Sequence, residues 1–169
     1  MERIYDNQRE AILVGYLAGI LDGEGSVSLK KSSANKHRKT PAYEGAVTLG
    51  MVYKDIVQLF VDRYGGTMRV ECVPNRQPIY RYAKVGTQGV KTILEELVLF
   101  LIEKRERAEM LLEYYDSIDN TRHRNALGQT LPMSEQELSK REDFYLRMKE
   151  LNARKHPQRL TERTPEKVK

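Results

Sequence analysis

The stretch LVGYLAGILDGEGSVSLKKS, residues 13–32, joins an apolar helical segment to a strand in which apolar and polar residues alternate. Two acidic residues, Asp22 and Glu24, stand between glycines where the helix should end. The C-terminal end of a helix carries the negative pole of its dipole, so carboxylates there are unfavourable unless a positive group compensates them. Hard divalent cations such as Mg²⁺ bind clusters of carboxylate and carbonyl oxygens. The pair therefore indicates a metal site, because it is a poor choice for stability alone.

The helix of this stretch is expected to begin after Asn7, whose side chain can cap it while Glu10 completes a capping box, and to stop at Gly23. Gly15 and Gly19 lie four residues apart with Ala18 beside them, so one face of the helix carries almost no side chains. Glycine in a helix interior costs about 1 kcal/mol relative to alanine, which calls for a packing reason. The small residues predict close contact with another helix, either in the chain's own core or across a dimer seam.

Beyond this helix the sequence alternates hairpins and helices. Strands are expected at 26–32 and 43–52, a helix at 55–64, strands at 67–73 and 78–85, helices at 90–101 and 104–118, and a last helix at 134–154. The pair Gly65 and Gly66 should end the second helix, and Ser134 with Glu137 should open the last one as a capping box. This order predicts an α+β fold of αββαββα type, with one antiparallel sheet covered by helices on its apolar face and further C-terminal helices. Residues 1–119 would form the core. Residues 120–169 would supply a linker, a helix and a polar tail that pack on this core or extend it.

The uncovered face of the predicted sheet would be basic and rich in hydroxyl groups. Its candidate residues are Ser28, Lys30, Ser32, Glu44, Thr48, Arg69, Glu71 and Arg81, joined by Lys36 and Arg38 in one connecting loop and Arg76 in another. A twisted β-ribbon with such a face can enter a DNA major groove, where these side chains can bond base edges or phosphates. A sheet face that is simply solvated is equally compatible with this composition.

Composition limits the classes of protein that remain. The formal net charge of +5 and the pI of about 9.2 favour an anionic partner such as nucleic acid. The single Cys72 excludes an intrachain disulfide and a cysteine zinc cluster, and it is expected to be buried in a strand. No apolar run approaches the roughly 18 residues that a membrane span needs, and the N-terminus shows no apolar segment of signal-peptide type. We therefore expect a soluble intracellular protein, cytoplasmic or organellar.

The segment LAGILDGEG, Leu17 to Gly25, resembles the nine-residue signature of the LAGLIDADG homing endonucleases. It differs by exchanged aliphatic residues at Ile20 and Leu21, by Gly23 in place of Ala, and by Glu24 in place of the second Asp. The order of predicted elements over roughly residues 8–118 matches the fold of that family. Since the signature occurs once, the chain resembles the single-motif members that act as homodimers.

The resemblance implies roles for particular residues. Glu24 would bind the divalent metal and Gly23 would lend it a carbonyl oxygen, while Asp22 would help to structure the turn. The seam between the signature helices of two subunits would include Gly15, Ala18, Gly19 and Asp22. The segment FLIEKRERA, 100–108, resembles the family stretch that places a lysine, here Lys104, near the active site. Tyr53 occupies a place where the family commonly has Gln, a residue that helps to organise active-site water.

The function implied by the resemblance is that of a Mg²⁺-dependent, site-specific endonuclease. Such an enzyme makes a staggered double-strand break with 3′ overhangs in a long, roughly palindromic DNA site, and it is intron- or intein-encoded. It needs double-stranded DNA and a second copy of the chain, but no small-molecule cofactor. Two other interpretations remain open: a nucleic-acid-binding module that no longer cuts, such as an RNA maturase or a regulator, and a purely structural dimerisation domain.

Overall fold

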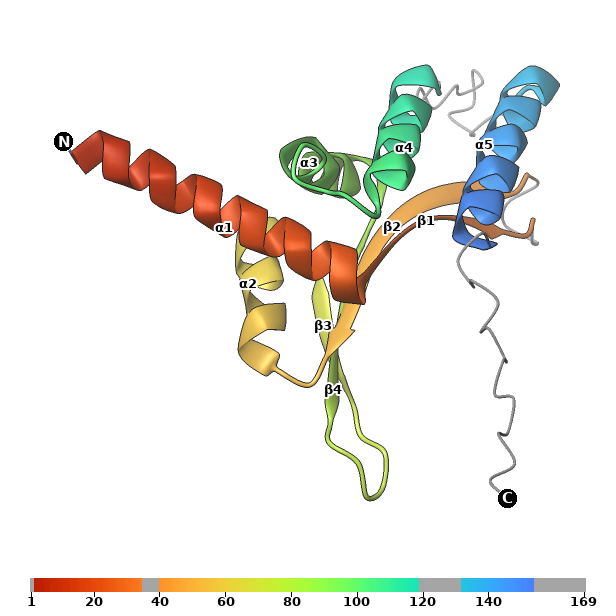
Figure 1. The fold of residues 1–169 in the computed structure, drawn as a ribbon. Coiled ribbons are helices and arrows are strands. Elements are labelled where there is room, and N and C mark those ends of the chain that lie inside the picture. Colours follow the sequence, from red (N-terminus) through yellow and green to blue (C-terminus); the bar gives the residue numbers. More distant parts are fainter. Residues whose placement is uncertain (1, 35–39, 119–131, 154–169) are drawn as a thin grey trace, which may run out of the picture.

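The computed structural model describes residues 2–34, 40–118 and 132–153, and Figure 1 shows how their helices and strands are arranged. The elements in chain order are α1 (Glu2–Glu24), β1 (Gly25–Ser32), β2 (Ala42–Met51), α2 (Lys54–Tyr64), β3 (Thr67–Glu71), β4 (Ile79–Val85), α3 (Thr87–Leu97), α4 (Arg105–Ser117) and α5 (Glu135–Ala153). The predicted order of helices and hairpins is therefore confirmed. Among the described helices, none is both long enough and apolar enough to cross a membrane.

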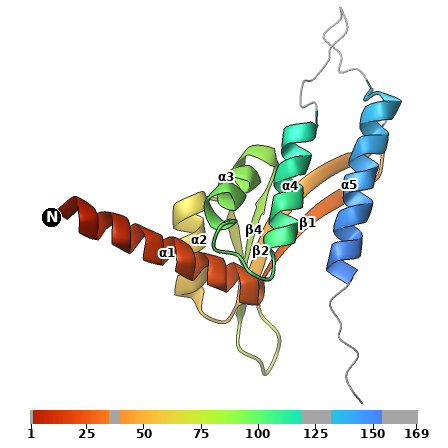
Figure 2. The same cartoon turned by 45° about the horizontal axis from the view of Figure 1, so that its top comes forward.

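The four strands form one antiparallel sheet in the order β1-β2-β4-β3. Val27 of β1 lies opposite Val47 of β2, so the register places the apolar residues of both strands on one face. The helices cover that face, and the strands bend so that the opposite, uncovered face is concave (Figures 1 and 2). Strand alternation places all eight sheet residues predicted for the uncovered face on that side: Ser28, Lys30, Ser32, Glu44, Thr48, Arg69, Glu71 and Arg81.

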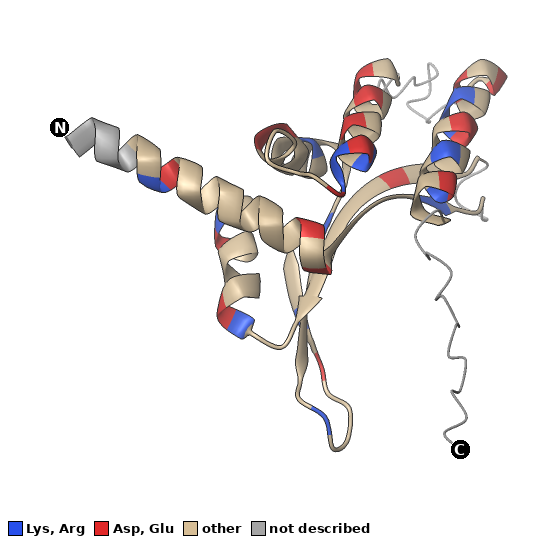
Figure 3. Ribbon diagram, in the orientation of Figure 1, with Lys and Arg blue, Asp and Glu red and all other residues tan. Residues whose placement is uncertain are grey.

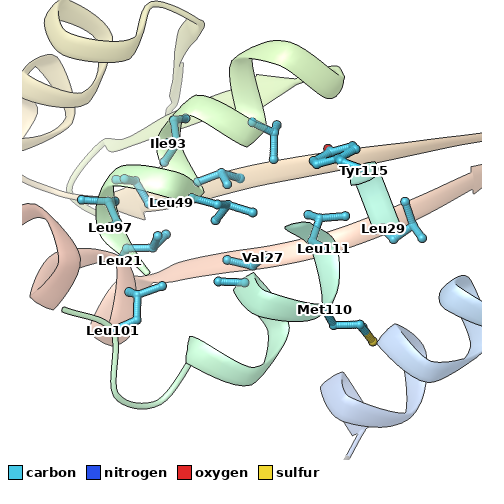
Figure 4. Packing of buried hydrophobic residues seen from close by; sticks show 14 of the residues in the cluster. Leu21, Val27, Leu29, Leu49, Ile93, Leu97, Leu101, Met110, Leu111 and Tyr115 are labelled. Atoms are coloured by element: carbon cyan, nitrogen blue, oxygen red, sulfur yellow. The ribbon is translucent and has the colours of Figure 1, made fainter. Parts of the chain in front are cut away.

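The core lies between the covered face of the sheet and helices α1, α3 and α4 (Figure 4). Leu21 near the end of α1 and Val27 of β1 are both fully buried, and they bring the helix and the strand of the signature stretch together. Ile93 of α3 and Leu111 of α4 are also fully buried, and they complete the layer above the sheet. The apolar positions that gave the sequence its periodicity are thus the residues that hold the helices on the sheet.

Several predicted boundaries were wrong. Helix α1 begins at Glu2, upstream of Asn7, and it continues past Gly23 to Glu24. Helix α3 ends at Leu97, so the apolar run that follows belongs to the connection to α4. Cys72 is exposed and follows the last residue of β3, because the β3–β4 ribbon projects beyond the helices that cover the rest of the sheet (Figure 1).

Helix α5 lies against the far ends of β1 and β2. The backbone N–H of Glu137 donates to the Ser134 hydroxyl at 3.2 Å, which confirms the predicted cap at the start of this helix. Glu142 of α5 accepts hydrogen bonds from the Tyr43 hydroxyl and from the Lys31 ammonium, the latter at 2.7 Å. These contacts hold α5 on the strand ends, and they lower the pKa of the Glu142 carboxyl, chiefly through its bond to Lys31.

Gly45 in the middle of β2 is required by close packing. A Cβ atom at this position would overlap the hydroxyl oxygen of Tyr115, which projects from α4 onto the sheet. Tyr115 is buried and its hydroxyl has no hydrogen-bond partner among the described residues. The ring therefore lies on bare backbone, and its hydroxyl is buried without compensation.

We expect Gly45→Ala to lower the free energy of unfolding by about 1–3 kcal/mol, because the new methyl group overpacks this contact. Tyr115→Phe should leave stability unchanged or raise it slightly, since it removes an unpaired buried hydroxyl. Combining the two changes should cost less than Gly45→Ala alone. Urea denaturation of the three variants would measure this, and an undiminished cost in the double variant would show that the Tyr115 hydroxyl is not the obstacle.

Candidate functional site

The C-terminal end of α1 meets the connection between α3 and α4. The Asp22 carboxylate accepts backbone N–H bonds from Ile102 at 2.6 Å, Glu103 at 3.3 Å and Lys104 at 3.0 Å. The ammonium group of Lys104 donates to the main-chain carbonyl of Asp22. Donors from the connection thus converge on the negative end of α1, which compensates the unfavourable placement of an acid there. Asp22 is accordingly bound within its own chain.

Lys104 is held close to this helix end with little exposure. Its side chain is only 12% accessible, and its Nζ atom lies 2.9 Å from a carboxylate oxygen of Glu103. Burial lowers the pKa of the Lys104 ammonium below its ordinary value, and the guanidinium of Arg107 acts in the same direction. The carboxylates of Asp22 and Glu24 oppose this shift. The structure therefore brings Lys104 and Glu24, which were predicted as site residues, within electrostatic reach of each other.

Glu24 is the last residue of α1, and its side chain is exposed. The chain passes from Glu24 into β1 without a loop, because Gly25 packs directly on Leu21, where a Cβ atom would overlap the leucine side chain. Glu24 also lines an open groove of about 570 Å³ on the uncovered side of the sheet. The other polar residues that line this groove are Ser26, Thr48, Thr67, Arg69 and Arg81.

The donors available to a metal ion in one chain are few. The described residues contain no group of three or more His, Cys, Asp or Glu side chains that could hold an ion. Asp22 is already bound by three backbone N–H groups, so Glu24 is the free carboxylate at this helix end. Gly23 is exposed beside it, and the last carbonyl groups of a helix have no partner within the helix. These donors fit a divalent cation that is shared with further ligands from outside the chain.

Two arginines lie directly opposite each other on the uncovered face. Arg69 of β3 pairs in register with Arg81 of β4, an arrangement that is unfavourable unless an anion or an acid separates the charges. Arg81 forms an ion pair with Glu71, and its side chain lies next to Gly50 of β2, where a Cβ atom would lie 3.0 Å from the guanidinium. Arg69 pairs with no side chain of the described residues. This face therefore offers one oriented and one free guanidinium group.

The outward face of α1 carries small and apolar residues. A Cβ atom added to Gly19 or Gly23 would meet no atom within 4 Å, so both positions are open to a neighbour. Ile12 is 71% exposed and Tyr16 is 46% exposed on the same helix. Ala18, which we expected on this face, is instead fully buried in the chain's own core. The prediction that Ala18 belongs to a dimer seam was wrong for this reason.

The other residues predicted for the site lie apart from this helix end. Tyr53 immediately precedes α2 and is 68% exposed, and it is not among the residues that line the groove. Arg76 lies in the turn of the projecting β3–β4 ribbon, where its N–H bonds the carbonyl of Val73 at 3.1 Å (Figure 3). Lys36 and Arg38 lie outside the described residues. Lys30 and Glu44 are exposed on the uncovered face, opposite each other in register.

The sequence did not reveal the partners of Asp22. Ile102 and Glu103 contribute main-chain N–H groups, and a backbone donor leaves no signal in the choice of residue. The sequence shows this connection only as the apolar run LVLFLI at 97–102. In the structure Leu99 and Ile102 of this run are 77% and 88% exposed. Phe100 of the same connection would lie 3.8 Å from a Cβ atom on Gly15, so this exposed segment adjoins α1.

Comparison with solved structures identifies the fold. The chain matches the homing endonuclease I-CvuI, in complex with its target in the presence of 2 mM Ca, with a TM-score of 0.66, 20% identity, and coverage of 83% of this chain and 82% of that one. It matches the DNA-bound LAGLIDADG homing endonuclease I-LtrWI with a TM-score of 0.58 and 17% identity over 79% of this chain and 43% of that one. The DNA-bound archaeal intron-encoded homing endonuclease I-Vdi141I gives a TM-score of 0.54 and 15% identity over 81% and 99%.

These likenesses establish that the chain has the fold of the LAGLIDADG homing endonucleases, as its signature stretch predicted. The sequences share 20% identity or less, so the likeness lies in the arrangement of helices and strands. No protein-family model matches the sequence, and no curated protein matches it either.

Lys104 should be a cost to stability, because burial disfavours its charged form. Lys104 has a lower pKa in the folded chain than in the unfolded chain, so near the ordinary lysine pKa the unfolded chain binds more protons. The loss of stability that burial causes is therefore greatest at neutral pH, and it becomes smaller as the pH rises toward 10.5. We expect Lys104→Met to melt no lower than the unaltered chain near neutral pH. Its advantage should shrink at alkaline pH.

Melting curves over this pH range, with Lys149→Met on the exposed side of α5 as the control, would measure the effect. The control should show a small difference from the unaltered chain that does not change with pH. A Lys104→Met protein that melts well below the unaltered chain at neutral pH would show that the favourable contacts of this ammonium outweigh its burial.

Proposed function

We propose that this chain is a site-specific DNA endonuclease of the homing type, which acts as a homodimer and makes a metal-dependent, staggered double-strand break in a long, roughly palindromic site. The observation that carries the proposal is the end of α1. There a free carboxylate, Glu24, lines a groove on the uncovered side of the sheet, and a half-buried lysine, Lys104, lies within electrostatic reach of it. Structural positions that cost stability indicate chemistry when they gather at one place.

The uncovered face supports DNA as the partner. Arg69 and Arg81 face each other there, and such a like-charge pair is relieved when a polyanion binds between or along the two groups. Arg81 is oriented by its ion pair with Glu71 of β3, and its side chain lies next to Gly50 of β2, so its guanidinium is prepared for bidentate bonds to a base edge. Solved structures with the same fold hold DNA, among them I-CvuI and I-LtrWI.

A homodimer is supported by the outward face of α1. Gly19 and Gly23 leave space for a second helix, and Ile12 and Tyr16 supply apolar surface around them. The chain spans 43% of I-LtrWI but 82% of I-CvuI, so it provides one unit of this fold. Pairing two copies through α1 would bring both Glu24 residues to the same place, which supplies the further ligand that one chain lacks.

Mg²⁺ fits the donors at this helix end. Glu24, with the carbonyl of Gly23, would hold the ion, which when bound lowers the pKa of a water nucleophile and neutralises charge on the phosphoryl oxygens. Solved structures of I-CvuI were obtained with 2 mM Mg or 2 mM Ca. The chain's own contribution is the Lys104 ammonium, a fixed positive charge near the phosphate, and the basic sheet that positions the duplex. A role in intron or intein mobility is part of the same proposal.

Glu24→Gln tests the proposal directly, because it keeps the shape of the side chain and removes the charge that holds Mg²⁺. We expect cleavage to be lost. Binding to a cleavable DNA site should persist or tighten, because one anion that faces the phosphates is gone. Melting without metal should stay level or rise slightly, since an acid at a helix C-terminus costs about 0.3–1 kcal/mol.

A duplex library incubated with Mg²⁺, with sequencing of the cut ends, would identify a site for a nicking assay, a binding titration and a melting curve. The matched control is Glu109→Gln on the exposed side of α4, which should cut as the unaltered chain does. Full cleavage by the Glu24→Gln protein would remove Glu24 from the active site. Sequence-specific binding without any cutting by the unaltered chain would instead favour a non-cleaving module.

Gly19→Leu should separate the two subunits without unfolding either. Among the described residues, no atom outside the backbone of α1 lies within 4 Å of a Cβ atom at this position, so each chain should fold, whereas a close helix contact cannot accommodate the new side chain. Sedimentation should then change from dimer to monomer, and double-strand cleavage should be lost. Lys149→Leu, at an exposed position of α5, should leave the assembly unchanged. An unaltered chain that sediments as a monomer at micromolar concentration would contradict the proposed assembly.

A further inference from the structure

We propose that Asp22 is the positioning residue of the site, which sets the place of Lys104 beside Glu24 by binding the connection between α3 and α4. This proposal rests on the proposed function, because it assigns Asp22 a part in that reaction. Asp22 would do so without contact to DNA or to the metal ion. It would act through Lys104 alone, in contrast to the turn-forming and seam roles that the sequence suggested.

The hydrogen bonds that the Asp22 carboxylate accepts come from the segment that carries Lys104. Both carboxylate oxygens are used, one by Lys104 N–H at 3.0 Å and the other by Ile102 N–H at 2.6 Å and Glu103 N–H at 3.3 Å. The Lys104 ammonium bonds the main-chain carbonyl of the same residue. Backbone and side chain of Lys104 are therefore both tied to α1, and Glu24 follows Asp22 by only two residues on that helix.

The connection has other contacts within the chain, because the Glu103 carboxylate pairs with the Lys104 ammonium and with Arg107, whose guanidinium also donates to the Glu103 carbonyl. Leu101 is fully buried before the segment and Arg107 is 6% exposed after it, so both flanks are anchored in the core. Between these flanks, Ile102 is 88% exposed and the side chain of Glu103 is 36% exposed. Lys104 is the N-cap of α4, but its side chain makes no capping hydrogen bond. Asp22 thus binds, from another helix, the N–H of the N-cap residue of α4 and the two N–H groups before it.

A carboxylate is required for this contact. Three N–H donors converge on two oxygens, and an amide in the same place would turn an NH₂ group toward at least one of them. Asp22→Asn should therefore release the 102–104 segment while leaving the shape of the side chain unchanged. The consequence expected for the reaction is a displaced ammonium, and a displacement of roughly 1 Å can cost on the order of 100-fold in rate.

The first arm of the test measures how well Asp22 protects the 102–104 amides, and it needs neither DNA nor metal. Hydrogen exchange of the 102–104 amides, followed by mass spectrometry or NMR, should become faster in Asp22→Asn. The matched control is Asp62→Asn on α2, an exposed acid that accepts one bond, from Gln58 at 2.8 Å. Exchange at 102–104 should be unchanged in the control. Equal protection of these amides in Asp22→Asn and in the unaltered chain would overturn the proposal.

The second arm measures whether Asp22 acts through Lys104. Single-turnover cleavage should fall by about 100-fold in Asp22→Asn with the DNA dissociation constant unchanged, and Asp62→Asn should cut normally. In a Lys104→Met background, adding Asp22→Asn should change the rate by no more than about twofold, because no ammonium is left to misplace. If Asp22→Asn lowers the rate by the same factor in the Lys104→Met background as in the unaltered chain, Asp22 does not work through Lys104. A loss of DNA binding as large as the loss of rate would lead to the same conclusion.

Two outcomes separate this proposal from the proposed function. A chain that cuts no DNA would contradict the endonuclease assignment, and the exchange arm would still decide whether Asp22 anchors the segment. A chain that cuts DNA but loses nothing in Lys104→Met would refute the role of Lys104, and with it the positioning role of Asp22. If Asp22→Asn does not fold, Asp22→Ser, which keeps a short oxygen acceptor without the charge, takes its place in both arms.

Discussion

The contact on which this structure depends is the set of backbone hydrogen bonds to the Asp22 carboxylate. It joins the end of α1 to a segment 80 residues further along the chain. Because α1 runs directly into β1 at Gly25, the same helix end also fixes where the sheet begins. An acid at the C-terminus of a helix would ordinarily weaken it, but here the acid is surrounded by donors. The position of Glu24 relative to both the sheet and Lys104 follows from this junction.

One face of the sheet packs against helices and the other carries polar side chains. Two glycines of β2, one facing each side, illustrate this difference. On the covered side, Gly45 lets the ring of Tyr115 from α4 lie on the backbone, so the helix packs closely. On the uncovered side, Gly50 leaves room for the side chain of Arg81 on the neighbouring strand β4, which pairs with Glu71 of β3. Any larger residue would hold the helix or the arginine away from the sheet. Close packing and an oriented polar surface are thus built on opposite faces of one strand.

The sequence predicted the fold because its signals are local. Period-two alternation in β1, the glycine pair after α2 and the cap that Ser134 provides for α5 each depend on neighbours in the chain, and the structure bears them out. Of the predicted capping box only this half is seen, because the Glu137 carboxylate bonds Arg141. The predictions that failed depend on distant contacts. Glu10 bonds Arg63 of α2 instead of capping a helix start, and Ala18 faces the core instead of outward. The backbone donors to Asp22 could not be predicted, because any residue supplies an N–H group.

The two acids of the signature stretch have different surroundings, and in the proposed dimer this difference would leave each chain with half of the metal site. Asp22 uses both carboxylate oxygens inside the chain, so it has little capacity left for an ion. Glu24 is free, but a single carboxylate with nearby carbonyl groups binds Mg²⁺ weakly. The small residues that would let a second helix approach, Gly19 and Gly23, lie on the same helix within a few residues of Glu24. In the proposed dimer, therefore, the contact that assembles the subunits would also complete the metal site, so a chain that cannot pair would hold an incomplete site.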